Sequence, residues 1–409
     1  MHHVIIGNGI AGVSAAEAIR RIDPHSAITM IGDETEIPYC RPMISMVLEG
    51  ALGPERLPIR GRDFYASLKI SPLLGERVTA LDTDARQVTI GEGRTISYDR
   101  LLIASGADPR PIKAEGCDLE NIFFLRNQAQ VRRMQAVLPD AREALVLGGG
   151  LVGFKAAYGL LRRGLKVTLV IRSGYPLSMQ ADETAGAMVL AELCRQGLDV
   201  RVGVEAIGFE GGTAVRRAHL SDGTQLACDL VVVGKGVLPA HSFVNRSQIT
   251  VDLGIVVDAH MRTGAAHVFA AGDVAEAVDL ARQTRWVNAI WPEAVAQGRL
   301  AGQNMAGRSV AGTGSLGRNV IRIFDLDIMT GGIVSPEQEK GYEILQCHDP
   351  RSHTYRKMVF QCDRLVGVVM VNRIEQGGVL LSMIQGRIPV AIDKEKMLSP
   401  GFNYAQLLP

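Results

Sequence analysis

The first stretch of the chain, residues 4–33, constrains the fold more than any other. Val4–Ile6 is apolar and β-branched, as in a buried strand, and Gly-Asn-Gly-Ile-Ala-Gly follows at 7–12. A helix of small residues then extends to about Arg21, and Ile28–Ile31 is a second apolar strand. Strand, glycine turn, helix and strand in this order predict a βαβ unit that binds a dinucleotide.

The residues of this turn have separate tasks. Gly7 permits a tight turn, Gly9 lets the backbone approach a pyrophosphate, and Gly12 lets the helix pack closely on the strand. The amides at the helix start, at Ile10 and Ala11, point at the phosphates, and the helix dipole favours their negative charge. The turn therefore predicts a phosphate cradle.

The same pattern recurs in the middle of the chain. Leu145–Leu147 is an apolar strand, a glycine-rich turn occupies 148–153, a helix extends to about Arg163, and Lys166–Ile171 is the next strand. Two such units in one chain are more diagnostic than one. The residues expected at the second dinucleotide are Gly148, Gly150, Leu151, Val152 and Gly153.

The residues after the second strand of each unit differ in charge. Asp33 and Glu34 follow the first unit, and a carboxylate from either can bind the ribose hydroxyls of an adenosine. In the second unit Arg172 stands there and no acid follows at once. An arginine can pair with a 2′-phosphate, which favours NADPH. The choice between NAD and NADP stays open.

Composition and charge argue against several classes of function. The 409 residues carry a net charge of +1, which gives no reason to expect a nucleic-acid or membrane-surface partner. The chain opens directly on a strand, so no signal peptide is expected, and the apolar run 144–161 contains the second glycine turn, so no membrane span is expected. Six scattered cysteines lack metal or disulfide spacing, so we expect no metal site and reduced thiols in a cytoplasmic protein.

Four further landmarks lie outside the two units. A buried-strand run ends at Ala104-Ser105-Gly106, and a second one ends at Gly272-Asp273. Trp291-Pro292 begins a helix to about Met305, with proline in the first turn. Beyond Gly314 short strands predominate. The predicted fold class is α/β, with two Rossmann-like domains and a C-terminal α+β domain.

Together these landmarks resemble the pyridine nucleotide-disulfide oxidoreductase superfamily of FAD- and NAD(P)-dependent flavoproteins. Within it, Pro-Tyr-Cys-Arg-Pro at 38–42 and the stretch 291–298 are similar to the NADH:rubredoxin reductase and nitrite reductase flavin-domain branch. The stretch 4–20 and Gly-Phe-Lys at 153–155 resemble the FAD subunits that accompany tungsten-dependent aldehyde oxidoreductases.

The resemblance implies a division of the chain into three domains. Residues 1–112 and 240–315 would form a discontinuous FAD-binding domain, and residues 113–239 would bind NAD(P). Residues 316–409 would form an interface or docking domain. The branch as a whole leans to NADH.

The resemblance also implies roles for single residues. Asp273 would hold a flavin ribityl hydroxyl, and the Arg41-Pro42 turn would lie along the FAD pyrophosphate. The free amides after Trp291 could face the pyrimidine side of the flavin and stabilise its reduced anion, although a core aromatic is the alternative for Trp291. The remaining residues expected at the FAD are Ala104, Ser105, Gly106, Gly272 and Pro292.

The chain departs from the family pattern at three positions. No redox cysteine pair exists, and Cys40 follows the Pro-Tyr dipeptide where single-cysteine relatives carry theirs before it, so a packed thiol is expected. Met46 replaces the usual lysine and Lys155 the usual glutamate. We hypothesise that the Lys155 ammonium sits where flavin and nicotinamide meet; the alternative is a snorkelling surface lysine.

These features predict an enzyme that links two-electron and one-electron carriers. A hydride would move between nicotinamide and flavin N5, and the flavin would exchange single electrons with rubredoxin, ferredoxin or an iron–sulfur subunit. That subunit could belong to a tungsten aldehyde oxidoreductase. The alternatives are an NAD(P)H oxidase and a non-catalytic subunit that holds flavin or senses redox state.

Overall fold

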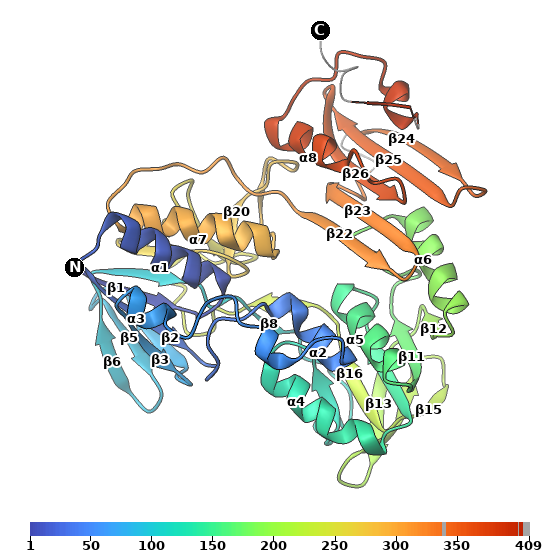
Figure 1. Cartoon of the computed structure of the whole chain (residues 1–409), viewed down its shortest axis with the longest axis horizontal. Coiled ribbons are helices and arrows are strands. Elements are labelled where there is room, and N and C mark those ends of the chain that lie inside the picture. Colours follow the sequence, from blue (N-terminus) through green and yellow to red (C-terminus); the bar gives the residue numbers. More distant parts are fainter. Residues whose placement is uncertain (338–340, 400, 404–409) are drawn as a thin grey trace. The chain divides into compact units, whose positions relative to one another are not determined.

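The structure, a computed structural model, describes residues 1–337, 341–399 and 401–403 (Figure 1). They divide into two compact units. The first unit consists of Met1–Cys40, Leu57–Asp108 and Leu238–Gly317. The second consists of Arg41–Arg56, Pro109–Val237 and the described residues from Arg318 onward. Each unit therefore combines segments that are far apart in the sequence.

The first unit is built on a parallel sheet with the strand order β19-β7-β1-β2-β3. Val4 and Ile5 in β1 and Leu101 in β7 are fully buried, as expected for parallel strands covered on both faces. The strands of this sheet are β1 (His2–Ile6), β2 (Ala27–Gly32), β3 (Ile70–Leu74), β7 (Arg100–Ile103) and β19 (Val268–Ala270).

Smaller elements complete this unit. One small sheet joins β4 (Val78–Asp82), β5 (Gln87–Ile90) and β6 (Arg94–Ser97), and another joins β18 (Ile255–Val256), β20 (Ala275–Val278) and β21 (Arg285–Trp286). The helices are α1 (Ile10–Ile22), α3 (Phe64–Ser67) and α7 (Trp291–Met305). Two short strands, β8 (Ala107–Pro109) and β17 (Val237–Pro239), pair with each other where the chain passes from one unit to the other.

Helices α1 and α7 lie side by side (Figure 1) and touch through their backbones. A Cβ added at Gly298 would lie 2.2 Å from the carbonyl oxygen of Ala11, and one at Gly302 would lie 2.4 Å from that of Ala15. Because the two glycines are one turn apart, they form a groove on α7 that receives the backbone of α1. This contact places the start of α1 beside the middle of α7.

The second unit repeats the parallel design, with the strand order β12-β11-β10-β16-β9. Its strands are β9 (Ile122–Phe124), β10 (Glu143–Leu147), β11 (Lys166–Ile171), β12 (Asp199–Val202) and β16 (Leu230–Val233). A separate antiparallel sheet contains β13 (Ala206–Gly211), β14 (Val215–Leu220) and β15 (Gln225–Ala227). The helices are α2 (Ile44–Glu49), α4 (Gln128–Val137), α5 (Leu151–Arg162) and α6 (Glu183–Arg195).

Helix α2 belongs to this unit although it lies early in the sequence. A Cβ added at Gly159 in α5 would lie 3.4 Å from the Glu49 nitrogen, so the two helices pack closely. Arg163 Nε donates to the Leu48 carbonyl at 2.8 Å and caps the end of α2. The segment 41–56 is therefore held by α5.

The C-terminal part of the second unit is an antiparallel sheet with the order β22-β23-β26-β25-β24 and the helix α8 (Gly377–Gly386). Its strands are β22 (Arg318–Ile323), β23 (Leu326–Gly332), β24 (Glu343–Asp349), β25 (Thr354–Gln361) and β26 (Arg364–Val371). Asp182, which caps α6, accepts hydrogen bonds from Tyr355 Oη at 2.6 Å and Lys357 Nζ at 3.0 Å. This buried polar contact joins the sheet to α6.

The predicted fold class is confirmed: two parallel Rossmann-like sheets are followed by an α+β part. The apolar run 144–161 contains the end of β10, the glycine turn and most of α5. Among the residues that the structure describes, no helix combines the length and the apolar character needed to cross a membrane.

Candidate functional site

The first glycine turn forms an open cradle between β1 and α1. Gly7 has a left-handed φ of 118°, and a Cβ there would lie 2.0 Å from the Ala104 carbonyl oxygen. A Cβ at Gly12 would lie 2.1 Å from the Gly7 carbonyl oxygen, whereas one at Gly9 would meet no atom within 4 Å. Helix α1 starts at Ile10 without a side-chain cap. Open space above uncapped helical amides fits a pyrophosphate.

The two acidic residues after β2, Asp33 and Glu34, have different surroundings. Asp33 lines a small cavity beside the cradle, together with Gly7 and Ser105. Glu34 instead accepts a hydrogen bond from Tyr39 Oη at 2.5 Å. Asp33 is therefore the better placed carboxylate for a ribose next to this turn.

A polar contact from outside the βαβ unit steadies the turn. Tyr65 Oη donates to Asn8 Oδ1 at 2.9 Å, and Asn8 Nδ2 donates to the Glu36 carbonyl at 3.0 Å. Burial raises the pKa of Tyr65, and the hydrogen bond to Asn8 opposes that rise. The phenol is therefore protonated and a donor at neutral pH. The contact between Tyr65 and Asn8 is not predictable from the sequence, because no local pattern links two residues so far apart.

The Gly272-Asp273 turn lies against the start of α1. The Gly272 amide donates to the buried Gln297 Oε1 at 2.9 Å, and a Cβ on Gly272 would lie 3.1 Å from that of Ala11. Asp273 therefore directly follows the residue that contacts the start of α1. Nearby, the Ser105 hydroxyl donates to the Ala240 carbonyl at 2.6 Å and anchors the Ala104-Ser105-Gly106 turn.

The approach to α7 is held by a buried carboxylate. Asp279 is fully buried, and its Oδ2 accepts from Asn288 Nδ2 at 2.8 Å. Asn288 also contacts Ser315 Oγ at 2.8 Å, and its carbonyl accepts from the Ile290 amide at 2.8 Å. Helix α7 then begins at Trp291, with Pro292 in its first turn and no side-chain cap at Ile290. The loop before α7 is therefore held by hydrogen bonds, and it fixes the position of the first amides of the helix.

The second glycine turn has the same geometry in the second unit. Gly148 has a φ of 112°, and a Cβ there would lie 2.4 Å from the Gly234 carbonyl oxygen. A Cβ at Gly153 would lie 1.9 Å from the Gly148 carbonyl oxygen, while one at Gly150 would meet nothing within 4 Å. Helix α5 begins at Leu151, followed by the partly exposed Val152. These residues fit a second dinucleotide.

Two features of this second cradle concern its rim. Gly234 follows β16, and its carbonyl oxygen lies against Gly148 as that of Ala104 lies against Gly7. The Val-Val-Gly-Lys-Gly run at 232–236, with glycine directly after an apolar strand, is the sequence pattern that marks this position. Arg172 is exposed directly after β11. The loop beyond it folds back, because the Leu177 amide donates to the Gly149 carbonyl at 2.8 Å. The side of the second cradle next to Gly149 therefore carries the guanidinium of Arg172, and no aspartate or glutamate directly follows β11.

The structure brings Lys155 to the Arg41-Pro42 turn within the second unit. Lys155 Nζ donates to the Pro42 carbonyl at 3.2 Å, and Arg41 Nη1 donates to the Arg126 carbonyl at 2.6 Å. Lys155 is exposed, so a desolvation cost for its ammonium does not apply. Met46 is 38% exposed on α2. Cys40 belongs to the first unit, and its amide donates to the Leu57 carbonyl.

Within the described ranges, no group of three or more histidine, cysteine, aspartate or glutamate residues could hold a metal ion.

Family models match nearly the whole chain. Residues 1–298 match the pyridine nucleotide-disulphide oxidoreductase model, and residues 318–388 match the C-terminal domain of rubredoxin NAD+ reductase. The chain is also similar to the putidaredoxin reductase in a covalent complex with putidaredoxin, with 28% identity and a TM-score of 0.86 over 95% of this chain and 94% of that one.

Two curated relatives match over most of this chain. The epsilon subunit of the NADH-dependent phenylglyoxylate dehydrogenase of Aromatoleum evansii is 32% identical over 389 residues, which cover 94% of this chain and 91% of the relative. The assimilatory nitrate reductase electron transfer subunit of Bacillus subtilis is 27% identical over 97% of this chain. The chain spans about half the length of that second relative, 51%.

Proposed function

This chain belongs to the pyridine nucleotide-disulphide oxidoreductase family, whose members bind FAD and NAD(P)H, and we propose that it passes electrons between NAD(P)H and a one-electron iron–sulfur partner through the flavin. The observation that carries the proposal is the pair of glycine cradles with matching geometry, one in each unit. Each is open only at its middle glycine, where a pyrophosphate would lie.

The chain's own residues would bind and orient the two dinucleotides. FAD, when bound, supplies hydride acceptance and single-electron exchange. Gly9 and the amides of Ile10 and Ala11 would hold its pyrophosphate, and Asp33 its ribose. Asp273 and the first amides of α7 would hold the flavin end, where the positive helix end favours a reduced, anionic ring. Gly150 and the start of α5 would hold the nicotinamide dinucleotide.

An iron–sulfur partner is supported by the names of several relatives. They include ferredoxin–NAD(+) reductase components and a rubredoxin–NAD(+) reductase. We assign partner docking to the domain 316–409, with 1–112 and 240–315 as the FAD domain and 113–239 as the NAD(P) domain. The finer version of the proposal places the chain in a cytoplasmic complex with a tungsten aldehyde oxidoreductase. Purification of the native protein, with metal analysis for iron and tungsten in co-eluting subunits, tests that version.

An anaerobic titration tests the proposed electron path. We expect the purified protein to be yellow, to be bleached by NADH or NADPH, and to be reoxidised by a ferredoxin or rubredoxin faster than by air. Bleaching followed by equally fast turnover in air without a protein acceptor would instead identify an NAD(P)H oxidase. A yellow protein that neither nucleotide bleaches would identify a non-catalytic flavin-holding subunit.

Replacing Lys155 tests its hypothesised place between the two rings. We expect Lys155→Met to slow flavin bleaching by NAD(P)H by about 10-fold, because one positive hydrogen-bond donor would be lost. Lys155→Arg should restore part of the rate. Stopped-flow absorbance measures the bleaching, and Lys166→Met, an exposed lysine of the same unit paired with Glu143, is the control. A normal rate for Lys155→Met would reject the hypothesis.

A further inference from the structure

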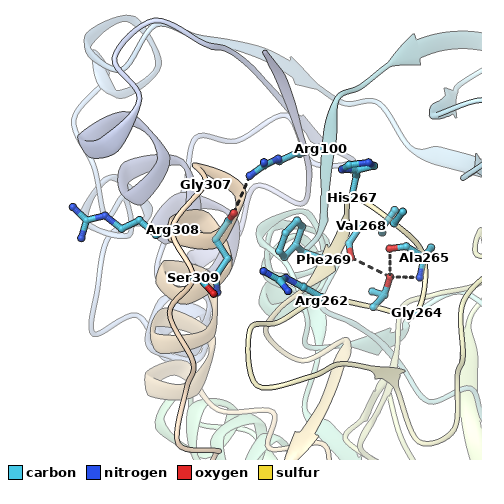
Figure 2. A pocket seen from close by; sticks show the side chains of 13 residues that line it. Arg100, Arg262, Gly264, Ala265, His267, Val268, Phe269, Gly307, Arg308 and Ser309 are labelled. Carbon is cyan, nitrogen blue, oxygen red and sulfur yellow. Dashed lines mark hydrogen bonds between the residues drawn. The ribbon is translucent and has the colours of Figure 1, made fainter.

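A pocket of about 410 Å³ lies in the first unit (Figure 2). Its lining residues do not include those of the glycine cradle. It is lined at the start of β7 by Arg100, at the start of β19 by Val268, and by the end of α7. The cradle residues Gly7 and Ala104 instead follow the carboxyl ends of β1 and β7. The pocket therefore lies at the amino-terminal ends of these parallel strands, opposite the cradle. Its volume lies in the range of small-molecule sites.

The lining of this pocket is basic. It contains Arg100, Arg262, Arg308 and His267, and no aspartate or glutamate occurs among its described lining residues. Arg100 Nη1 donates to the carbonyls of Asn304 and Met305, at 2.9 and 2.5 Å. These contacts fix its guanidinium at the last turn of α7 without a neutralising carboxylate. A concave surface of one charge sign attracts the opposite charge.

The loop 261–268 that forms one wall is held in a defined shape. Met261 and His267 both have left-handed backbones, with φ values of 62° and 65°, which are uncommon for residues other than glycine. Thr263 Oγ1 donates to the Val268 carbonyl at 3.0 Å and accepts from the Ala265 amide at 3.2 Å. Backbone strain of this kind persists only where surrounding contacts maintain it, and it clusters at ligand sites.

The basic side chains do not all point the same way. Figure 2 shows Arg100, His267 and Arg262 on the walls near Phe269, whereas the Arg308 side chain extends away from them. Arg262 makes no side-chain hydrogen bond or ion pair with any residue that the structure describes. Arg262 therefore brings an uncompensated charge to the wall, and Arg308 contributes mainly to the long-range field.

We propose that this pocket binds a small phosphate-bearing anion through Arg100, Arg262 and His267. Guanidinium groups present planar pairs of N–H donors that match phosphate oxygens. His267 adds a ring nitrogen donor, and the Thr263-fixed loop keeps it on the wall. The site is separate from both dinucleotide cradles and does not depend on the proposed electron path.

Calorimetric titration with inorganic pyrophosphate tests the proposal. The FAD-loaded protein is used with excess NAD+ and NADP+, so that both cradles are filled. We expect saturable binding of one pyrophosphate per chain, weakened at least 10-fold in Arg262→Ala and in His267→Gln. Arg308→Ala removes the same charge nearby from a side chain that points away, and it should change the affinity less than 3-fold.

The outcomes distinguish a specific binding site from nonspecific attraction of the anion to positive charge. No saturable binding, or equal weakening in Arg262→Ala and Arg308→Ala, would overturn the proposal. Flavin content and melting temperature of each variant verify folding. A second readout is the ¹⁵N signal of the His267 ring, assigned with His267→Gln: it should shift on pyrophosphate addition, and an unmoved signal would also overturn the proposal.

Discussion

Gly9→Glu is expected to yield a folded protein that has lost its flavin. No atom lies within 4 Å of a Cβ built at Gly9, and its φ is −86°, so the new side chain strains neither packing nor backbone. The added carboxylate would lie where the FAD pyrophosphate is proposed to bind. Close like charges cost several kcal/mol, which corresponds to at least about 100-fold in affinity. The ratio of flavin absorbance to protein, with circular dichroism and the melting temperature of the flavin-free protein, measures the effect.

Gly150→Glu is the matched control for that variant. It has the same open surroundings in the second cradle and a φ of −90°. We expect this variant to stay yellow but to resist bleaching by NADH and NADPH. If Gly9→Glu kept its flavin, or if Gly150→Glu lost flavin to the same extent, the assignment of FAD to the first cradle and of the nicotinamide dinucleotide to the second would be wrong.

Gly298→Val is expected to destabilise the first unit by about 3 kcal/mol, because overpacking against a rigid backbone is among the costliest substitutions. The new Cβ would lie 2.2 Å from the Ala11 carbonyl oxygen and 2.8 Å from the Ala11 Cα, and neither atom can move without separating α1 from α7. Separation of the helices would also displace Gly272 from the start of α1, so the flavin should be lost. Denaturant unfolding followed by flavin fluorescence and far-UV dichroism measures both.

Ala296→Val serves as the control for Gly298→Val. Ala296 is exposed on the same helix, so the substitution changes only helix propensity, at a cost below about 1 kcal/mol. Similar unfolding midpoints for the two variants would contradict the close backbone contact between α1 and α7.

The two cradles were predictable because their signal is local. Gly7, Gly9 and Gly12 act within one turn, and their roles follow from the strand before and the helix after them. The helix that begins at Trp291 was also predictable, from its proline and its length. The C-terminal part was predicted only as a run of short strands without their order, because the pairing of strands in an antiparallel sheet depends on neighbours that are distant in the sequence. The environment of Lys155 stayed open, because the apolar stretch around it does not show which face of the helix is covered; in the structure the side chain is exposed.

The sequence by itself therefore determined the fold class, the family and the two nucleotide cradles, because each rests on residues a few positions apart. Only the tertiary structure decided that Asp279 and Asn288 hold the approach to α7, that α2 packs on α5, and that Arg100, Arg262 and His267 line one pocket. The physical reason is that these groups meet through packing of segments tens to hundreds of residues apart, and no local spacing records which distant surfaces will bury each other.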